Sequence, residues 1–206
     1  MRRKTFDALA TIAGLVLAVV LAVAGGLMLW GHNFIDNQVH TQLAAQKIVF
    51  PANGTESLKS LPAADRTAMS QYAGQQLTTG PQAKVWADNY IAVHLGEIGA
   101  GQTYSQLSGK YMAMTPAQQA SAKGVALEGQ IQTVFRGETL RGLLLNAYAF
   151  GEMSFILFIA SIVSFAGAGL MLILSALGVA HLRRTPAEQE MFSKARATSA
   201  RPATAH

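Results

Sequence analysis

The sequence predicts an all-α fold in which two transmembrane helices flank an extracytoplasmic helical bundle. Residues 8–30 and 153–180 form two long apolar runs without a charged residue, and a helix of either length spans the roughly 30 Å hydrocarbon layer of a bilayer. Between them, residues 31–152 contain helix-like stretches separated by Gly and Pro, with no sustained alternation of apolar and polar residues. Because lipid offers no hydrogen-bond partners, each apolar run must satisfy its own backbone as a helix.

The distribution of charge predicts the orientation of these helices. Residues 1–7 carry three basic residues and one acidic residue, residues 181–206 carry five and two, and residues 31–152 carry eight of each. Basic residues beside a membrane span favour the cytoplasmic side. We therefore expect a multi-pass protein of the plasma membrane with both termini in the cytoplasm and residues 31–152 outside. The basic ends then contact anionic lipid headgroups, and nothing indicates binding to nucleic acid.

The first apolar run has an alternative interpretation as a signal peptide. Ala22-Val23-Ala24 has the form of a cleavage site. However, the apolar run continues to Trp30, and an aromatic residue at its outer end suits a membrane interface. We interpret residues 8–30 as an uncleaved anchor. The chain has no cysteine, which excludes disulfides and thiolate chemistry.

Small residues recur every four positions in both runs and predict helix packing within the membrane. Helices in lipid associate by close backbone approach, which small side chains permit. We expect the two runs to pack on each other through these stripes, or to pair with copies of themselves; alternatively, Ala and Gly are simply common in such spans. The predicted packing residues are Ala10, Gly14, Ala18, Ala22 and Gly26 in the first run and Ala160, Ser164 and Ala168 in the second.

The first half of the outer region predicts three helical segments, with a loop between the first and the second. Residues 32–49 extend the first span into water, because Ile35, Val39 and Leu43 form a narrow apolar stripe. A loop to about residue 62 and a helix over residues 63–77 should follow. Pro81 suits the first turn of a stronger helix that runs to about residue 98.

The second half of the outer region predicts a short helix and then a long one. Residues 104–114 form the short helix. Thr115-Pro116-Ala117-Gln118 has the form of a capping box, from which we expect a helix, with a kink near Gly124 or Gly129, up to the membrane. In the tail, residues 185–188 repeat this capping pattern and predict a short helix toward Lys194, and residues 193–206 have a disordered composition.

Three residues outside the first span suggest metal chemistry. His32, Asp36 and His40 are four apart, and two histidines with a carboxylate can hold non-haem iron. Eight residues of helix rise about 12 Å, whereas metal–nitrogen bonds are about 2 Å, so one straight helix cannot bring all three to one ion. A site would need ligands such as His94 and Glu97 from another helix. We predict no catalytic, cofactor or metal site.

A charged group precedes the second span. Glu138 and Arg141 are three apart and suit a helical salt bridge. The alternative is that Arg136, Glu138, Arg141 and Asn146 contact a partner protein or a lipid phosphate.

Several segments resemble a family of actinobacterial two-pass membrane proteins. The resemblance rests on residues 135–150 (FRGETLRGLLLNAYAF), 72–77, 91–95, 103–106 and the opening residues 1–7, and it extends to about Arg184. It implies the two-pass topology but no established activity. Members are often labelled aromatic ring-opening dioxygenases; the histidine geometry above does not support that activity here.

The leading functional prediction is a non-enzymatic integral membrane protein of the cell envelope, with a scaffold or accessory role. Its outer domain would bind a membrane-protein partner or another copy of the chain. The first alternative is an extracytoplasmic sensor module that signals through a partner. The second alternative, which ranks last, is a metal-dependent enzyme at the outer membrane face.

Overall fold

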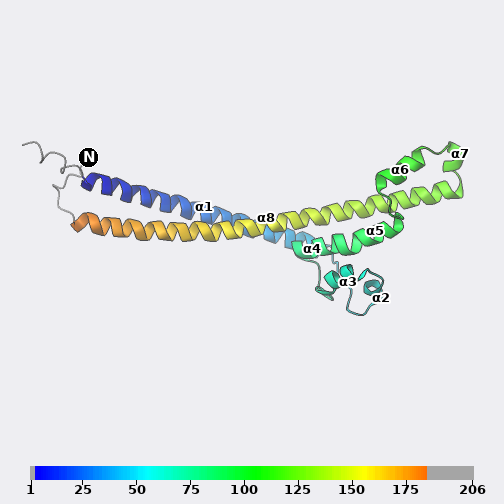
Figure 1. Cartoon of the computed structure of the whole chain (residues 1–206), viewed down its shortest axis with the longest axis horizontal. Helices are drawn as coiled ribbons and strands as arrows, with labels where there is room; N and C mark the ends of the chain where they lie inside the picture. The colour runs from blue at the N-terminus through cyan, green and yellow to red at the C-terminus, as the bar shows by residue number, and fades with distance from the viewer. Residues whose placement is uncertain (1–2, 185–206) are drawn as a thin grey trace, which may run out of the picture. The chain divides into compact units, whose positions relative to one another are not determined.

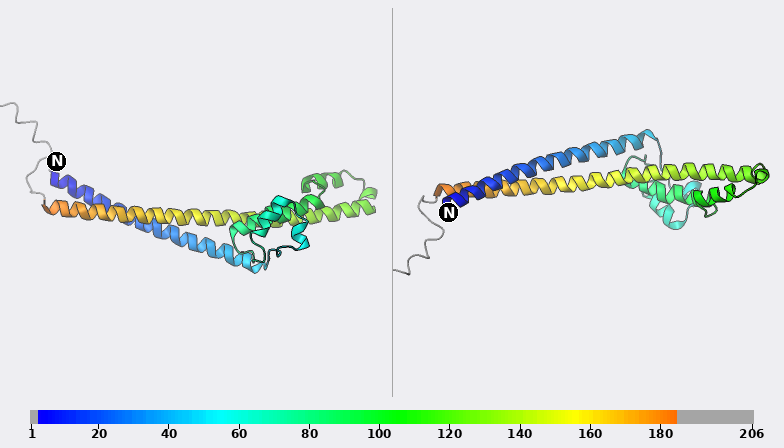
Figure 2. Two further views of the ribbon diagram at one scale, coloured as in Figure 1. Left: turned by 60° about the horizontal axis from the view of Figure 1, so that its bottom comes forward. Right: turned by 90° about the horizontal axis from the view of Figure 1, so that it is seen from above.

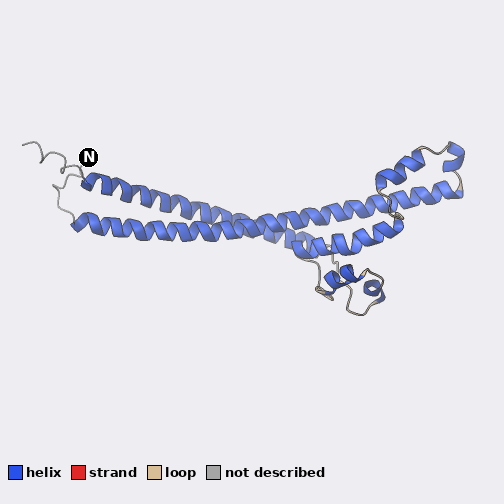
Figure 3. Cartoon of the chain, in the orientation of Figure 1, coloured by secondary structure: helices blue, strands red, loops and turns tan. Residues whose placement is uncertain are grey.

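The computed structural model describes residues 3–184, and every regular element in this range is a helix (Figures 1 and 3). This confirms the predicted all-α class. The elements are α1 (Arg3–Ala45), α2 (Glu56–Lys59), α3 (Ala63–Ser70), α4 (Gly80–Trp86), the π-helical turn η1 (Ala87–Ile91), α5 (Ala92–Ile98), α6 (Tyr104–Met112), α7 (Pro116–Gln119) and α8 (Ala122–Arg184). The predictions for residues 185–206 lie outside the described residues.

The helices form two compact units. The described part of the first unit comprises residues 3–30 and 157–184, and the second unit comprises residues 31–156. Both α1 and α8 contain a stretch long and apolar enough to cross a membrane. The predicted spans 8–30 and 153–180 lie within these two helices.

The first unit is an antiparallel helical hairpin. A histidine nitrogen of α8, His181 Nε2, lies 3.8 Å from Asp7 Oδ2 near the start of α1. Further along, Ser164 Oγ of α8 lies 3.9 Å from the sulfur of Met28 on α1. The blue part of α1 lies beside the yellow-to-orange part of α8 in both views of Figure 2. Residues 7 and 181 are therefore at the same end of the hairpin.

The contact between these helices follows alternate spacings of three and four residues. The recurring sheltered positions are 7, 11, 14, 18, 21, 25 and 28 on α1 and 161, 164, 168, 171, 175 and 178 on α8. This is the spacing of a left-handed helix pair. Ala18 and Ala168 are almost fully buried within it, with 2% and 4% of their surface exposed. We call these positions the seam.

The seam only partly coincides with the predicted small-residue stripes. Gly14, Ala18, Ser164 and Ala168 lie in the seam and Ala160 is half-buried, but Ala10, Ala22 and Gly26 are exposed. The reason is helical geometry: residues four apart advance by about 400°, so a five-residue stripe drifts about 160° around the helix. The structure places Gly25 in the seam instead of Gly26.

Residues 46–77 of the second unit differ from their predicted structure. Helix α1 ends at Ala45 rather than near residue 49, and Lys47 adopts a left-handed conformation with φ of 55°. Helix α2 lies in the predicted loop, and α3 stops at Ser70 rather than at residue 77. The chain then turns at Gly74, so that the Phe50 amide donates to the Gln75 carbonyl at 2.9 Å. The Gly74 amide in turn donates to the Phe50 carbonyl at 3.1 Å. If α3 continued to residue 77 as predicted, these backbone groups would instead form hydrogen bonds within the helix.

The predicted helix over residues 81–98 is present as the continuous run α4–η1–α5. Pro81 lies in its first turn, and Thr79 and Gln82 form a capping box at its start. The π-helical turn has no signal that we recognised in the sequence. The turn carries Asp88 and Asn89, which contact Arg141 of α8 and Asp65 of α3 respectively.

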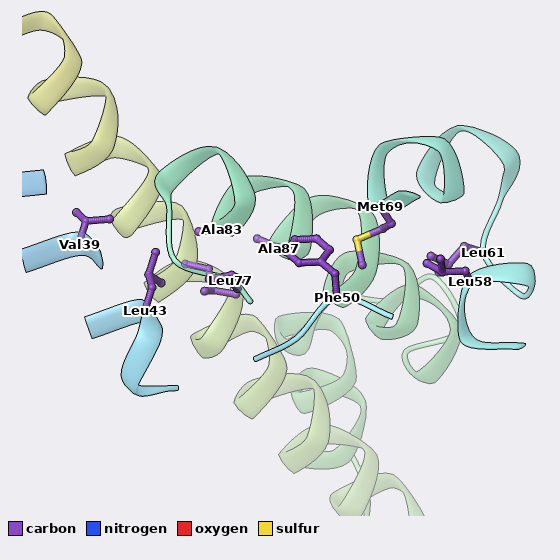
Figure 4. Close-up of a cluster of buried hydrophobic side chains, with 10 residues drawn as sticks. Val39, Leu43, Phe50, Leu58, Leu61, Met69, Leu77, Ala83 and Ala87 are labelled. Atoms are coloured by element: carbon purple, nitrogen blue, oxygen red, sulfur yellow. The ribbon is translucent and has the colours of Figure 1, made fainter. Parts of the chain in front are cut away.

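The core of the second unit is a buried apolar cluster whose side chains come from α1, α2, α3, α4, η1, α8 and the connecting segments (Figure 4). Phe50 is central to it, with 1% of its surface exposed. Its ring packs against those of Tyr72 and Trp86, with centroids 5.3 and 5.1 Å away. The ring array continues through Tyr90 to His94. A smaller cluster of Leu107, Ile131 and Val134 fastens α6 to α8.

The start of α8 corrects another prediction. Thr115 and Gln118 form the predicted capping box, but the helix it starts, α7, ends at Gln119. Ser121 Oγ accepts a hydrogen bond from the Gly124 amide at 3.3 Å, which caps α8. A Cβ on Gly124 would collide with the Gln119 carbonyl oxygen, so glycine permits a sharp turn here. The predicted kink is thus replaced by a break before Ala122, after which α8 is unbroken.

Candidate functional site

The first turn of α4 crosses α8 at two glycines. A Cβ on Gly80 would lie 3.2 Å from Tyr148 Cα and 3.3 Å from Gly151 Cα, and a Cβ on Gly151 would lie 3.3 Å from Gly80 Cα. All of these neighbours are backbone atoms, which cannot move aside as a flexible side chain can. Close packing of α4 on α8 therefore depends on glycine at both positions.

A charge network fastens the next turn of the α4–η1 run to α8. Lys84 Nζ lies 2.7 Å from Asp88 Oδ2, and Arg141 Nη2 lies 3.0 Å from Asp88 Oδ1. Hydrogen bonds from Lys84 and then from Arg141 lower the pKa of Asp88, although partial burial opposes them. The same carboxylate raises the pKa of Lys84, whose ammonium also lies 5.4 Å from the Tyr148 ring centroid.

This network gives the predicted contact residues before the second span different roles. Arg141 is about one-third exposed and is committed to Asp88, with Glu138 a further 3.5 Å partner. The sequence predicted the local Glu138–Arg141 pair, with contact to a partner protein or a lipid phosphate as the alternative, but it did not predict the contact with Asp88. Arg136, Glu138 and Asn146 are exposed on α8.

Beside the glycine crossing is a cavity of about 390 Å³. Its walls come from α1, from the segment that leads into α4, and from α8. The lining residues are Asp36, Val39, His40, Thr78, Thr79, Gly80, Pro81, Gly151, Glu152 and Phe155. We call this the junction cavity.

The junction cavity carries uncompensated negative charge. Five of the eight carboxylates in residues 31–152 have a polar partner, namely Glu56, Asp65, Asp88, Glu128 and Glu138. Asp36, Glu97 and Glu152 have no such partner within residues 3–184, and two of these three line the cavity. None of the lining residues is Lys or Arg.

The structure separates the residues considered for a metal site. His32 Nδ1 lies 2.8 Å from Ser154 Oγ, and His94 Nδ1 lies 2.7 Å from the Tyr90 carbonyl oxygen. Asp36 and His40 line the junction cavity, whereas Glu97 does not. Within residues 3–184, no group of three or more His, Cys, Asp or Glu is arranged to hold a metal ion.

Sequence reasoning singled out Asp36 and His40 but missed Glu152, Phe155 and the two glycines. Glu152 directly precedes the predicted second span and Phe155 lies within it, and the sequence analysis gave neither residue a role. Nothing in the sequence indicated that they line the same cavity as Asp36, because this depends on where α8 lies beside α1.

Comparison of the chain with protein-family models, with curated proteins and with solved structures finds no match. The resemblance to actinobacterial two-pass membrane proteins stays a prediction.

Proposed function

We propose that this chain is a two-pass integral membrane protein with both ends in the cytoplasm, and that its outer unit acts as a scaffold at the membrane surface. The observation that carries the membrane assignment is the sidedness of the hairpin. Nine of its thirteen seam positions are Gly, Ala, Ser or Thr, the others being Asp7, Leu21, Met28 and Met171, whereas large apolar side chains such as Val20, Leu27 and Ile173 point outward and are more than half exposed. This arrangement suits lipid, where small residues bring helices together and apolar surface needs no cover.

The scaffold role rests on an exposed face of α8 directly before the predicted span. Thr139, Leu143, Asn146, Phe150 and Met153 follow alternate spacings of four and three residues and are all exposed. Leu143 is 61% exposed, and Phe150 and Met153 are each 52% exposed. We call these five residues the α8 face.

The occupant we propose for the α8 face is a second copy of the chain in the same orientation. The face runs into the predicted membrane segment at Met153, so an occupant must itself leave the bilayer as a helix. A copy related by a two-fold axis along the membrane normal provides such a helix and brings identical residues together. Asn146 would then meet its counterpart, and a polar residue at the centre of an apolar helix pair fixes register and partner number.

Single cysteines test this proposal, because the natural chain has none. In native membranes, oxidation of the Leu143→Cys or Asn146→Cys variant should give a disulfide-linked dimer. Gly142→Cys is the matched control, since residue 142 is exposed but lies about 100° around the helix from residue 143. Equal crosslinking at all three positions, or none at 143 and 146, would contradict self-association through the α8 face.

A sensor is the second candidate function, and the junction cavity favours it. Two of its walls belong to α1 and α8, and each of these helices continues without a break into the hairpin. A ligand that moved the two helices would alter the seam. Saturating ligand should therefore change the rate of disulfide formation between cysteines at Thr11 and Gly178; an unchanged rate would count against a sensor.

A further inference from the structure

We propose that the junction cavity binds a primary ammonium group, either of a phospholipid headgroup or of a small soluble amine. The proposal goes beyond the scaffold role and does not depend on it. The cavity has the size of a small-molecule site, because its volume of about 390 Å³ lies within the range of such sites and exceeds what a single ordered water requires.

Charge determines the sign of the ligand. Asp36 on α1 and Glu152 on α8 approach the cavity from different helices, and neither has an ion-pair or hydrogen-bond partner within residues 3–184. No Lys or Arg among the described residues lines the cavity. Lys84 follows Pro81 on α4, and Arg141 precedes Gly151 on α8, but both of these side chains pair with Asp88. A cation in the cavity would therefore meet two unneutralised carboxylates, and an anion would be repelled by both.

The donor set favours an organic cation over a metal ion. The described residues offer no group of three ligands arranged for a metal. A primary ammonium needs less: three N–H donors that can meet carboxylate oxygens and the imidazole of His40. The remaining walls include Val39, Pro81 and Phe155, which suit the methylene groups beside an ammonium, and an aromatic ring attracts a cation over its face.

The position of the cavity explains why a lipid headgroup is one of the two sources. Glu152 and Phe155 lie on either side of residue 153, where the second span is predicted to begin. The cavity would then be at the depth of the headgroups, where the ethanolamine of a phospholipid carries its ammonium. The same chemistry is available from ethanolamine in solution, so the experiment must separate the two.

The test uses the full-length protein in nanodiscs of phosphatidylglycerol, which has no ammonium group. In the first arm, phosphatidylethanolamine is added and bound lipid is counted by native mass spectrometry. In the second arm, ethanolamine is titrated into discs that lack phosphatidylethanolamine, and binding is followed by calorimetry. Binding in the first arm alone assigns the site to a headgroup; binding in the second arm assigns it to a soluble amine.

The variants connect binding to the cavity. The double variant Asp36→Asn/Glu152→Gln should weaken binding at least tenfold, and Phe155→Leu should weaken it several-fold. Glu97→Gln is the matched control, because Glu97 is also an exposed carboxylate without a partner within residues 3–184 but lies outside the cavity. Because all the cavity substitutions are at exposed positions, helical content and thermal unfolding should be unchanged.

Two results would overturn the proposal: no binding in either arm, or binding that the double variant and Glu97→Gln reduce equally. Neither result bears on dimer formation through the α8 face, which the cysteine crosslinks test separately.

Discussion

Replacing Gly25 by leucine tests the packing of α1 against α8 in the hairpin, and the adjacent Gly26 supplies a control only one residue away. A Cβ on Gly25 would lie 3.1 to 3.2 Å from three ring atoms of Phe165, whereas a Cβ on Gly26 would meet nothing within 4 Å. Carbon atoms normally approach to about 3.5–4.0 Å. Even one added carbon at Gly25 therefore requires movement, and the three further carbons of leucine have no room while the helices stay in contact.

The expected cost of Gly25→Leu is about 2 kcal/mol, typical of overpacking at a close contact, which corresponds to roughly a thirtyfold shift away from the closed seam. A disulfide reports on that closure. A Cβ on Gly178 would lie 3.4 Å from Thr11 Cβ, close to the Cβ separation of about 3.5–4.5 Å in disulfides. The Thr11→Cys/Gly178→Cys variant of this cysteine-free chain should therefore oxidise readily in membranes.

In this background Gly25→Leu should slow disulfide formation at least tenfold, and Gly26→Leu should leave the rate within about twofold of the parent. The linked peptides are quantified by mass spectrometry after limited oxidation. Equal rates in the two leucine variants would refute the seam that we describe. A greater slowing of disulfide formation by Gly26→Leu than by Gly25→Leu would instead support the packing stripe at every fourth residue that the sequence predicted.

Three further predictions concern the second unit and are measured by thermal unfolding of the detergent-solubilised protein. Gly151→Ala should destabilise it by about 1–2 kcal/mol, because the new Cβ would contact backbone 3.3 Å away, whereas Gly142→Ala, with open space around it, should be neutral or stabilising; equal effects would contradict the glycine crossing. Phe50→Ala should cost about 3–5 kcal/mol, since its side chain is 1% exposed in the larger core cluster; a cost below about 1 kcal/mol would contradict that core. Asp88→Asn should cost about 1 kcal/mol at neutral pH; because the pKa of Asp88 is lower in the folded protein, its contribution is complete above the unfolded value near 4 and is lost as the pH falls through the folded value, so the difference from the natural protein should vanish in acid. If the difference in stability between Asp88→Asn and the natural protein grew in acid, the stabilising role of the ionised Asp88 carboxylate would be contradicted.

The sequence was sufficient for features that depend on local composition. The two long apolar helices follow from uninterrupted apolar runs, and the starts of α4 and α7 follow from Pro81 and from the Thr115 capping box. Local signals failed where the chain forms contacts distant in sequence. The end of α3 at Ser70 depends on backbone hydrogen bonds between residues 48–50 and 74–77. The spacing of apolar residues along the sequence does not predict these bonds.

The candidate site was predictable only in part, for a similar reason. Spacing on one helix identified Asp36 and His40 as neighbours. They share a cavity with Glu152 only because α8 lies beside α1 at this point. The need for glycine at positions 80 and 151 is visible only in the structure, where the two backbones approach closely. The π-helical turn at Ala87–Ile91 was equally hidden, because no residue in ADNYI distinguishes it from an ordinary helix.

The central claim is that the chain crosses the membrane twice, with its two ends together on the cytoplasmic side and residues 31–152 on the other. Single cysteines at exposed positions outside the predicted spans provide the most direct measurement: Phe6→Cys near the start of α1, Met112→Cys at the end of α6, and Arg184→Cys at the end of α8. Intact cells are treated with a membrane-impermeant maleimide, and lysed cells provide the reference for full labelling. The account predicts labelling of intact cells at residue 112 alone. Labelling at residue 6 or 184, or protection of residue 112, would contradict it.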